Sequence, residues 1–345
     1  MSSQKIFNVA VVGATGAVGE QMIRLLDERR FPIKQLKLLS SARSAGKIIQ
    51  FQGKDIMIEE ATVDSFHDID IALFSAGGDV SKALAPHAVA AGAICIDNTN
   101  AFRMDPNTPL IVPEVNMDKI NEHQGIIANP NCSTIQMVVA LKPLYDRYGI
   151  SRIIVSTYQA VSGAGQQAIT EMLRQTQEVL NGNQVTPDVL PVSSLAVKHQ
   201  IAFNAIPQID KFLDNGFTNE EMKMIRETKK IMDDDTLEIT ATCVRVPVVY
   251  SHSESVYVEL KSDFEIEELK QILASAPGIV LIDDMHNQLY PLATEATGKL
   301  DTFVGRVRKD LSHPRGLNMW IVSDNLLKGA AWNAVQIAEY IAVEQ

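Results

Sequence analysis

The chain has 345 residues, 46% of them hydrophobic, and a formal net charge of −11. This length favours two domains, each large enough to bury a core. No apolar run is long enough to cross a bilayer, and the acidic balance argues against a nucleic-acid partner, because neutralising phosphates needs clustered Lys and Arg. The first residues lack the apolar core and cleavage site of a secretory signal, so we expect a cytoplasmic protein.

Three cysteines without C-x-x-C spacing indicate neither a disulfide framework nor a zinc site, and we predict no metal.

Residues 5–31 predict a strand, a glycine-punctuated turn and a helix with apolar residues at helical spacing. Further apolar runs follow at 33–41, 68–78, 93–99 and 109–115, and a helical stretch at 80–92 separates two of them. Strands that alternate with helices indicate an α/β fold, so we predict a Rossmann-type, doubly wound parallel sheet.

After residue 132 a helical pattern runs to Gly149, with Pro143 expected to kink its last turn. From residue 151 the chain becomes rich in β alternation, at 151–161, 238–249 and 253–261, with helices expected at 168–180 and 219–234. We predict a second, α+β domain over residues 132–325, to which the family resemblance described below assigns catalytic and dimerisation function. The helix expected at 323–344 should pack back on the first domain, which we place at 1–131 plus 326–345.

Gly13, Gly16 and Gly19 lie directly between the first strand and the first helix. At such a turn the missing Cβ atoms let backbone N–H groups approach a pyrophosphate at the helix N-terminus. Tight packing of helix on strand is the alternative reading of the same glycines. The position at the first turn of an alternating chain favours a dinucleotide. The predicted cofactor contacts of this domain are Gly13, Thr15, Gly16, Ala17, Val18, Ser40, Ser41, Arg43 and Ser75.

Ser40, Ser41 and Arg43 follow the second predicted strand, where NAD sites usually carry an acidic residue for the ribose hydroxyls. Two hydroxyl donors and a guanidinium suit a 2′-phosphate instead. The sequence therefore favours NADP over NAD, with a solvated loop arginine as the alternative.

Cys132 follows Asn129, Pro130 and Asn131, which suit a turn, so the thiol falls in the first turn of a helix. Unpaired N–H groups at a helix start favour the thiolate, which is the nucleophilic form. Cys95 and Cys243 lie inside predicted strands and are better explained as small buried hydrophobes. Asn131 and the N–H groups of the helix start are candidate oxyanion donors.

Seven segments of the chain, taken in order, resemble aspartate-semialdehyde dehydrogenases. They are GATGAVG, NTNAFR, ANPNCST, YQAVSGAG, CVRVPV, SHSESV and SDNLLKGAAWNAVQIAE. The resemblance spans essentially the whole chain. It implies NADPH-dependent reductive dephosphorylation of β-aspartyl phosphate to aspartate 4-semialdehyde through a cysteine thioester, a step toward lysine, threonine and methionine. It also implies a homodimer.

The resemblance assigns roles residue by residue. Cys132 would be the nucleophile, Gln159 would orient the thioacyl group, and His252 would be the acid/base partner. Arg245 would bind the substrate α-carboxylate, Glu220 its ammonium group, and Arg103 with Lys223 its phosphate. Ser162, Gly163 and Asn325 match positions beside the nicotinamide half of the cofactor.

The same residues have plainer explanations. Glu220 and Lys223 are three apart on a charged helix, where an i,i+3 surface pair is ordinary. His252 alone is weak evidence, although an imidazole with a pKa of about 6.5 suits a proton shuttle. The competing functions are an N-acetyl-glutamyl-phosphate reductase, whose cysteine normally has different neighbours, and a non-catalytic NADP-binding homologue. The joint presence of Cys132, Gln159, Arg245 and His252 argues against the second.

Overall fold

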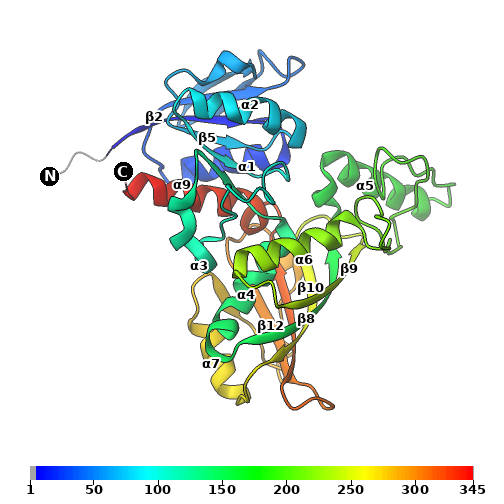
Figure 1. Cartoon of the computed structure of the whole chain (residues 1–345). Helices are drawn as coiled ribbons and strands as arrows, with labels where there is room; N and C mark the ends of the chain where they lie inside the picture. Colours follow the sequence, from blue (N-terminus) through cyan, green and yellow to red (C-terminus); the bar gives the residue numbers. More distant parts are fainter. Residues whose placement is uncertain (1–4, 345) are drawn as a thin grey trace. The chain divides into compact units, whose positions relative to one another are not determined.

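The computed structural model describes residues 5–344, which form two compact units. The first unit comprises residues up to Asn131 and those from Ala330 onward, and the second comprises Cys132–Gly329. Figure 1 shows the chain coloured along its sequence.

A seven-stranded sheet forms the centre of the first unit, in the order β3-β4-β2-β1-β5-β6-β7. Strands β1, β2, β4, β5, β6 and β7 pair in parallel, and β3 is antiparallel to β4. The chain moves outward from β1 in one direction and then in the other, which is the predicted doubly wound arrangement. The strand bounds are β1 (Phe7–Val12), β2 (Ile33–Ser40), β3 (Ile48–Phe51), β4 (Lys54–Glu60), β5 (Ile71–Phe74), β6 (Ile94–Asp97) and β7 (Ile126–Ala128).

Helices cover the sheet of the first unit. Helix α2 (Gly78–Ala90) packs on β5 and β6, while α1 (Ala17–Glu28) packs on β1 and on the C-terminal helix α9 (Trp332–Glu344) (Figure 1). The guanidinium of Arg29 bonds to Glu339 at 2.9 Å and lies over the Trp332 ring. The expectation that the last helix returns to the first domain is thus confirmed.

Two sequence expectations in this region were wrong. The apolar run 109–115 is not a strand, since Leu110 makes only an isolated bridge to Ala128 and Pro113 begins the short helix α3 (Pro113–Asn116). Proline is favoured at the first position of a helix, so Pro113 starts α3 where the apolar run suggested a strand. The expected helix 323–344 begins later, because Ser323 ends a strand and a π-helical segment (Leu327–Ala331) precedes α9.

The second unit is built on a mixed six-stranded sheet in the order β11-β12-β13-β10-β8-β9, which confirms the expected α+β domain. Strands β8 and β9 are parallel, whereas β10 is antiparallel to both β8 and β13. The bounds are β8 (Ile150–Gln159), β9 (Glu238–Arg245), β10 (His252–Leu260), β11 (Ile279–Leu281), β12 (Thr302–Lys309) and β13 (Gly316–Ser323).

Helix α4 (Cys132–Tyr148) is the central helix of the second unit. It contacts the sheet strands β8, β10, β12 and β13 and also packs against α6 (Asn219–Met232) and α7 (Ile266–Ser275). Because it is covered on several sides, almost its whole length up to Leu144 is buried, including the polar residues Ser133, Thr134 and Gln136. The sequence pattern predicted a helix with one apolar face, whereas the structure encloses this helix on most of its faces.

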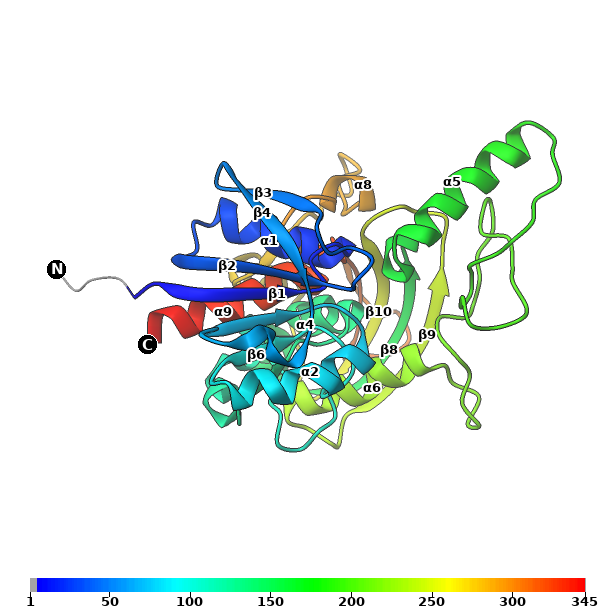
Figure 2. The same ribbon diagram turned by 90° about the horizontal axis from the view of Figure 1, so that it is seen from above.

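Helix α5 (Gln166–Leu180) and the segment after it extend away from the sheet of the second unit (Figure 2). A small apolar cluster ties them together, formed by Val161, Ala168, Ile169, Met172, Leu190, Ile201 and Ile206. The short helix α8 (Ala293–Ala296) packs on β13. Within residues 5–344, no helix has the length and apolar character required of a membrane span.

Candidate active site

A cavity of about 490 Å³ opens at the carboxyl ends of β1 and β5 in the first unit. Seven of the predicted cofactor residues line it: Gly13, Thr15, Gly16, Ser40, Ser41, Arg43 and Ser75. This edge, where the strand order reverses, is where doubly wound sheets bind dinucleotides. Ala17 and Val18 begin α1 and are not among the lining residues.

Gly13 explains why the turn needs glycine. Its φ is +91°, and a Cβ on it would lie 2.7 Å from the backbone of Ser75. A Cβ on Gly19 would lie 2.2 Å from the carbonyl oxygen of Gly13, so α1 is packed tightly on the turn. Both interpretations of the three glycines are therefore compatible. The helix packs tightly on the strand, and the turn formed by this packing borders the cavity.

The part of the cavity beside Ser40 and Arg43 combines predicted residues with ones that sequence reasoning missed. Thr15 Oγ1 lies 2.9 Å from Ser40 Oγ and 3.4 Å from Ser44 Oγ, so three hydroxyls gather beside Arg43. Glu60, at the end of β4, also lines the cavity. It was missed because the hairpin that brings β4 beside β2 has no motif of its own. The hydroxyls and the guanidinium offer hydrogen-bond donors to an anionic group.

Arg103 and Asn131 are both buried in the first unit. Arg103 Nε donates to the carbonyl of Asn129 and Nη2 to that of Asn98, each at 2.9 Å. These bonds hold the guanidinium beside the segment that leads into Cys132. Asp97, at the end of β6, is also buried, and burial raises the pKa of its carboxyl while Arg103 opposes that change.

Cys132 begins α4, as the sequence predicted, and it is partly exposed. Gly329 lies against it, because a Cβ on Gly329 would come within 2.8 Å of Cys132 Cβ. Cys95 and Cys243 are fully buried in strands, and burial raises both thiol pKa values, that of Cys95 to about 12. Both are therefore inert hydrophobes, as predicted.

His252 and Arg245 meet at the backbone of Ala160. The Ala160 N–H donates to His252 Nδ1 at 3.0 Å, and Arg245 Nη1 donates to the Ala160 carbonyl at 2.7 Å. Arg245 is buried on β9, and its pKa is lowered by burial while Glu220 and Cys132 raise it. The negative charge of a Cys132 thiolate therefore acts on the Arg245 guanidinium.

The imidazole does not have the ordinary pKa that the sequence expectation assumed. Burial, and after it the charge of Arg245, lower the pKa of His252 to about 3, while Glu220 opposes them. A neutral ring at physiological pH follows.

Gly163, which was predicted to contact the cofactor, lies beside the side chains of Arg245 and His252. A Cβ on it would be 2.9 Å from Arg245 Nη1 and 3.2 Å from His252 Nε2. Glycine at this position leaves room for both side chains.

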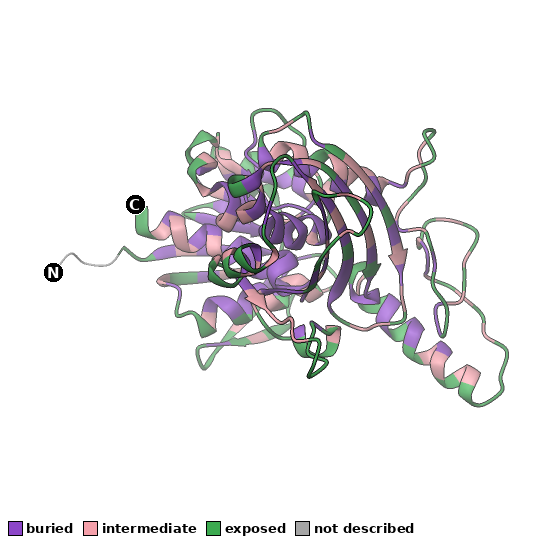
Figure 3. Cartoon of the chain, turned by 90° about the horizontal axis from the view of Figure 1, so that it is seen from below, coloured by how far each residue is buried: buried purple, intermediate pink, exposed green. Residues whose placement is uncertain are grey.

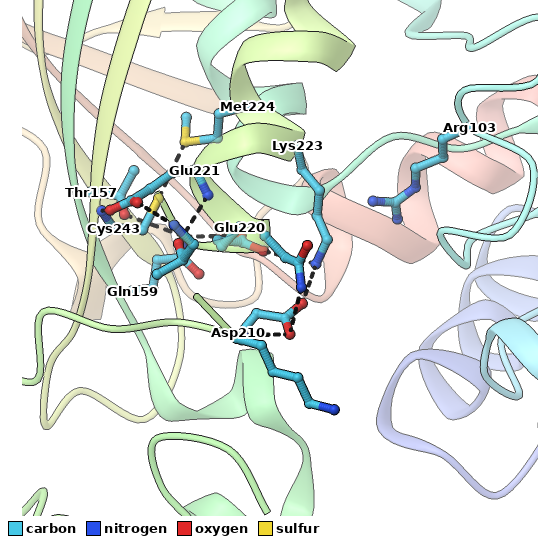
Figure 4. Close-up of polar contacts among 12 residues, drawn as sticks. Arg103, Thr157, Gln159, Asp210, Glu220, Glu221, Lys223, Met224 and Cys243 are labelled. Carbon is cyan, nitrogen blue, oxygen red and sulfur yellow. Dashed lines mark hydrogen bonds and ion pairs between the residues drawn. The ribbon is translucent and has the colours of Figure 1, made fainter. Parts of the chain in front are cut away.

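Gln159, Glu220 and Lys223 form a second polar cluster, in which Glu220 lies between the other two (Figure 4). Gln159 Nε2 donates to Glu220 Oε1 at 3.1 Å, and Lys223 Nζ lies 3.2 Å from both Glu220 Oε2 and Asp210 Oδ2. The i,i+3 pair is present, but Glu220 is buried, so the surface-pair reading was wrong for it. Sequence reasoning missed Asp210, which lies in a loop without a motif.

The two other residues matched to the nicotinamide half bond to each other. Ser162 Oγ donates to Asn325 Oδ1 at 3.1 Å, and the N–H of Ser251 donates to the same oxygen at 3.0 Å. Asn325 thus joins the end of β13 to the segments before α5 and β10. No cluster of three or more metal-binding side chains occurs within residues 5–344.

Comparison with known proteins decides the family. The family described as "Semialdehyde dehydrogenase, NAD binding domain" matches residues 8–123, and the family described as "Semialdehyde dehydrogenase, dimerisation domain" matches residues 141–328. The chain is 60% identical over 333 residues to the aspartate-semialdehyde dehydrogenase of Bacillus subtilis, with 96% of each chain covered. The chain belongs to the aspartate-semialdehyde dehydrogenase family.

Other relatives agree. The enzyme of Legionella pneumophila is 53% identical over 340 residues, which cover 98% of this chain and 96% of that protein. The crystal structure of aspartate semialdehyde dehydrogenase II from Vibrio cholerae, complexed with ASA, matches with a TM-score of 0.93 at 49% identity, covering 98% and 99% of the two chains. The chain is thus an oxidoreductase with aspartate-semialdehyde dehydrogenase activity, and it has a nicotinamide-dinucleotide-binding domain and a dimerisation domain.

Proposed function

We propose that the chain uses Cys132 as a nucleophile for the reversible, NADPH-dependent conversion of β-aspartyl phosphate to aspartate 4-semialdehyde. The observation that carries this proposal is the cluster of polar side chains in the second unit. Arg245 is electrostatically coupled to Cys132 and shares the Ala160 backbone with His252. A partly exposed thiol at a helix start, beside a buried cation, suits a thiolate.

The chemistry uses the thiol twice. The sulfur attacks the C4 carbonyl, and the phosphate leaves with the C–O bond pair to give a thioester. NADPH, when bound, supplies hydride. The thiolate is afterwards a good leaving group, so the aldehyde can depart.

The charged groups of the substrate find matching side chains on the chain. We assign the α-carboxylate to Arg245, the ammonium group to Glu220, and the phosphate to Lys223 and Arg103. Gln159, whose amide donates to Glu220, orients the acyl group. Asn131 stays a candidate oxyanion donor.

We propose NADP rather than NAD as the cofactor, bound in the cavity of the first unit. Arg43, Ser40 and Ser41 line that cavity and suit a 2′-phosphate. In the second unit we assign Ser162, Gly163 and Asn325 to the nicotinamide half. We also propose a homodimer and a cytoplasmic location.

The decisive assay supplies aspartate semialdehyde and phosphate and follows the reduction of NADP and of NAD side by side. Turnover should require phosphate and should be faster with NADP. Cys132→Ser should abolish turnover and leave NADPH binding intact, because only the nucleophile is lost. Cys95→Ala, which removes a buried thiol of raised pKa, is the matched control and should stay active. Full activity of Cys132→Ser would refute the assignment.

A further inference from the structure

Glu221 follows Glu220 in the first turn of α6, and its side chain is buried. Its two carboxylate oxygens accept hydrogen bonds from two separate backbone segments. The N–H of Thr218 donates to Oε2 at 2.7 Å, before the helix begins. The N–H of Cys243 on β9 donates to Oε1 at 3.0 Å (Figure 4). One side chain therefore joins the start of α6 to β9.

Only the first of these bonds belongs to an ordinary helix start. Thr218 and Glu221 form a capping box, in which the Thr218 hydroxyl also accepts from the Glu221 N–H at 3.3 Å. A capping box satisfies the amides of its own helix, so it does not account for the bond to Cys243. Strand β9 is at the edge of its sheet, where outward N–H groups need acceptors from other segments. Arg245 finds its acceptor in the Ile206 carbonyl at 2.9 Å, and Cys243 finds its acceptor in the Glu221 carboxylate.

The bonded stretch of β9 carries Arg245. Cys243 and Arg245 are two residues apart, so their side chains share one face of the strand, and both are buried. Helix α6 packs on this face, since Cys243 Sγ lies 3.7 Å from Met224 Sδ. The bond between Glu221 and Cys243 therefore fixes the start of α6 against the strand segment that ends in Arg245.

Glu220 is directed at the same strand end. Gln159 pairs with Arg245 where β8 and β9 end together, and the Gln159 amide donates to Glu220 Oε1 at 3.1 Å. Burial lowers the pKa of Arg245, and Glu220 is the largest opposing charge. The two side chains to which we assign the ammonium and α-carboxylate groups thus come from elements that Glu221 joins.

The spacing of these two groups matters because of the chemistry of the substrate. Its ammonium and α-carboxylate groups are bonded to the same carbon atom, so the substrate cannot adapt to a changed separation of Glu220 and Arg245. Misplacing a binding group by about 1 Å can cost up to about 10²-fold in rate. A rigid connection between α6 and β9 is therefore a requirement for reading both groups at once.

We propose that Glu221 is a positioning residue that fixes Glu220 relative to Arg245, so that the enzyme selects an aldehyde with an ammonium group beside its α-carboxylate. This inference rests on the proposed function, which assigns those two groups, and adds the residue that holds their binding partners in place. Both oxygens of Glu221 are occupied by backbone N–H groups, so it acts through Glu220.

The first test compares two aldehydes in the phosphate-dependent assay with NADP. Aspartate semialdehyde carries the ammonium group, and 4-oxobutanoate is the same chain without it. The unsubstituted protein should prefer the first by at least about 10²-fold in kcat/KM. In Glu221→Gln this ratio should fall at least about tenfold, because the amide presents a donor to one of the two backbone N–H groups. The KM for NADP should change less than about twofold.

Thr218→Ala is the matched control. It removes the capping hydroxyl of the same helix but keeps the backbone N–H of residue 218 and the whole Glu221 side chain. The substrate ratio should stay within about twofold of that of the unsubstituted protein, although the helix loses a cap. Thermal unfolding checks that both variants are folded. An equal fall of the ratio in the two variants would reduce Glu221 to a helix cap and overturn the inference, as would an unchanged ratio in Glu221→Gln.

A further measurement needs no variant. The amide of Cys243 lies on a sheet edge, so it should be strongly protected from hydrogen exchange only if the Glu221 carboxylate holds it. Rapid exchange of this amide in the unsubstituted protein would overturn the inference, whether or not Glu221→Gln folds. An unsubstituted protein that does not distinguish the two aldehydes would instead count against the assignment of the ammonium group to Glu220 in the proposed function.

Discussion

Two glycines beside the proposed catalytic groups are required by their neighbours and not by backbone conformation. Gly163 faces Arg245 and His252, and Gly329 lies against Cys132. In each case a methyl group would take space that a reactive side chain already occupies. Such positions carry a mechanistic constraint although the residue itself has no chemistry.

Gly163→Ala should therefore reduce activity more than it reduces stability. Its Cβ would displace the Arg245 guanidinium or the His252 ring, and a misplacement of about 1 Å in a catalytic group can cost up to about 10²-fold. We expect kcat/KM to fall at least about tenfold, and the free energy of unfolding to fall by about 1–3 kcal/mol. Ala164→Ser, at the exposed neighbouring position, is the control for both measurements. Unchanged kinetics in Gly163→Ala would show that the cluster tolerates displacement.

Glu254 gives a second prediction for a single residue. Its carboxyl group is fully buried, and burial raises its pKa well above the ordinary value, although the Gln136 side chain opposes this shift. The folded state keeps the proton that the unfolded chain releases above about pH 4.3. Stability should therefore be full below that pH and fall as pH rises toward the folded-state pKa.

Glu254→Gln removes the titratable carboxyl group and with it this dependence of stability on pH. Relative to the variant, the unsubstituted protein should lose up to about 1.4 kcal/mol of unfolding free energy per pH unit between pH 5 and 8. Denaturant unfolding at several pH values measures the difference. A difference independent of pH would mean that Glu254 ionises normally in the folded protein.

At the scale of one element, α5 shows how a buried carboxylate holds a long segment. Glu171 accepts hydrogen bonds from the backbone N–H groups of Asp188, Val189 and Leu190, and from the Gln175 side chain. Gln175 in turn accepts from the N–H groups of residues 201 and 202. Two side chains one turn apart thus anchor most of the segment that follows the helix.

Glu171→Gln should loosen that segment and leave the sheet intact. An amide in place of the carboxylate presents a donor to backbone N–H groups, so we expect a loss of about 1–3 kcal/mol. Hydrogen exchange of amides 188–190 should accelerate, and limited proteolysis should cut first between residues 181 and 206. Glu178→Gln on the same helix, whose carboxylate forms the surface pair with Arg174, is the matched control. Unchanged protection at 188–190 would contradict this account of the anchor.

At the scale of the molecule, the sheet of the second unit has two unlike faces. Helices α4, α6 and α7 pack on one of them. Along β8, buried and more exposed residues alternate (Figure 3). Ile154 and Tyr158, on the side away from the buried positions, are each 38% exposed, and the Tyr158 and Trp320 ring centroids are 5.4 Å apart. We infer that the apolar side chains Ile154, Tyr158 and Trp320 on this otherwise mixed face contribute to the contact between two copies of a chain that has a dimerisation domain.

Ile154→Glu should therefore shift the protein from dimer to monomer. A carboxylate in an apolar interface loses its hydration without gaining a partner. Sedimentation velocity at several concentrations measures the shift. Leu311→Glu, at a fully exposed turn between β12 and β13, should not change the oligomeric state. A dimer unaffected by Ile154→Glu would place the interface elsewhere.

The first domain was easier to predict than the second because its signals are local. The glycine turn, the apolar runs and the spacing of the first helix act over short stretches of chain. The run 109–115 and the start of the last helix were predicted wrongly, since proline and a π-helical turn overrode apolar periodicity there. For the site, the helix start made Cys132 a candidate and the surrounding motifs selected it, whereas Gln159 and Asn325 came from family resemblance alone.

The sequence by itself determined the fold class and the family, and it singled out Cys132 as a candidate nucleophile, because periodicity, turn chemistry and motif order are properties of neighbouring residues. The tertiary structure decided the state of the groups around that thiol. The Ala160 N–H bonds to His252 Nδ1, burial raises the pKa of Glu254, and Asp210 meets Lys223 from a distant loop. Burial and hydrogen-bond partners depend on residues far apart in the chain, so no local pattern could have shown them.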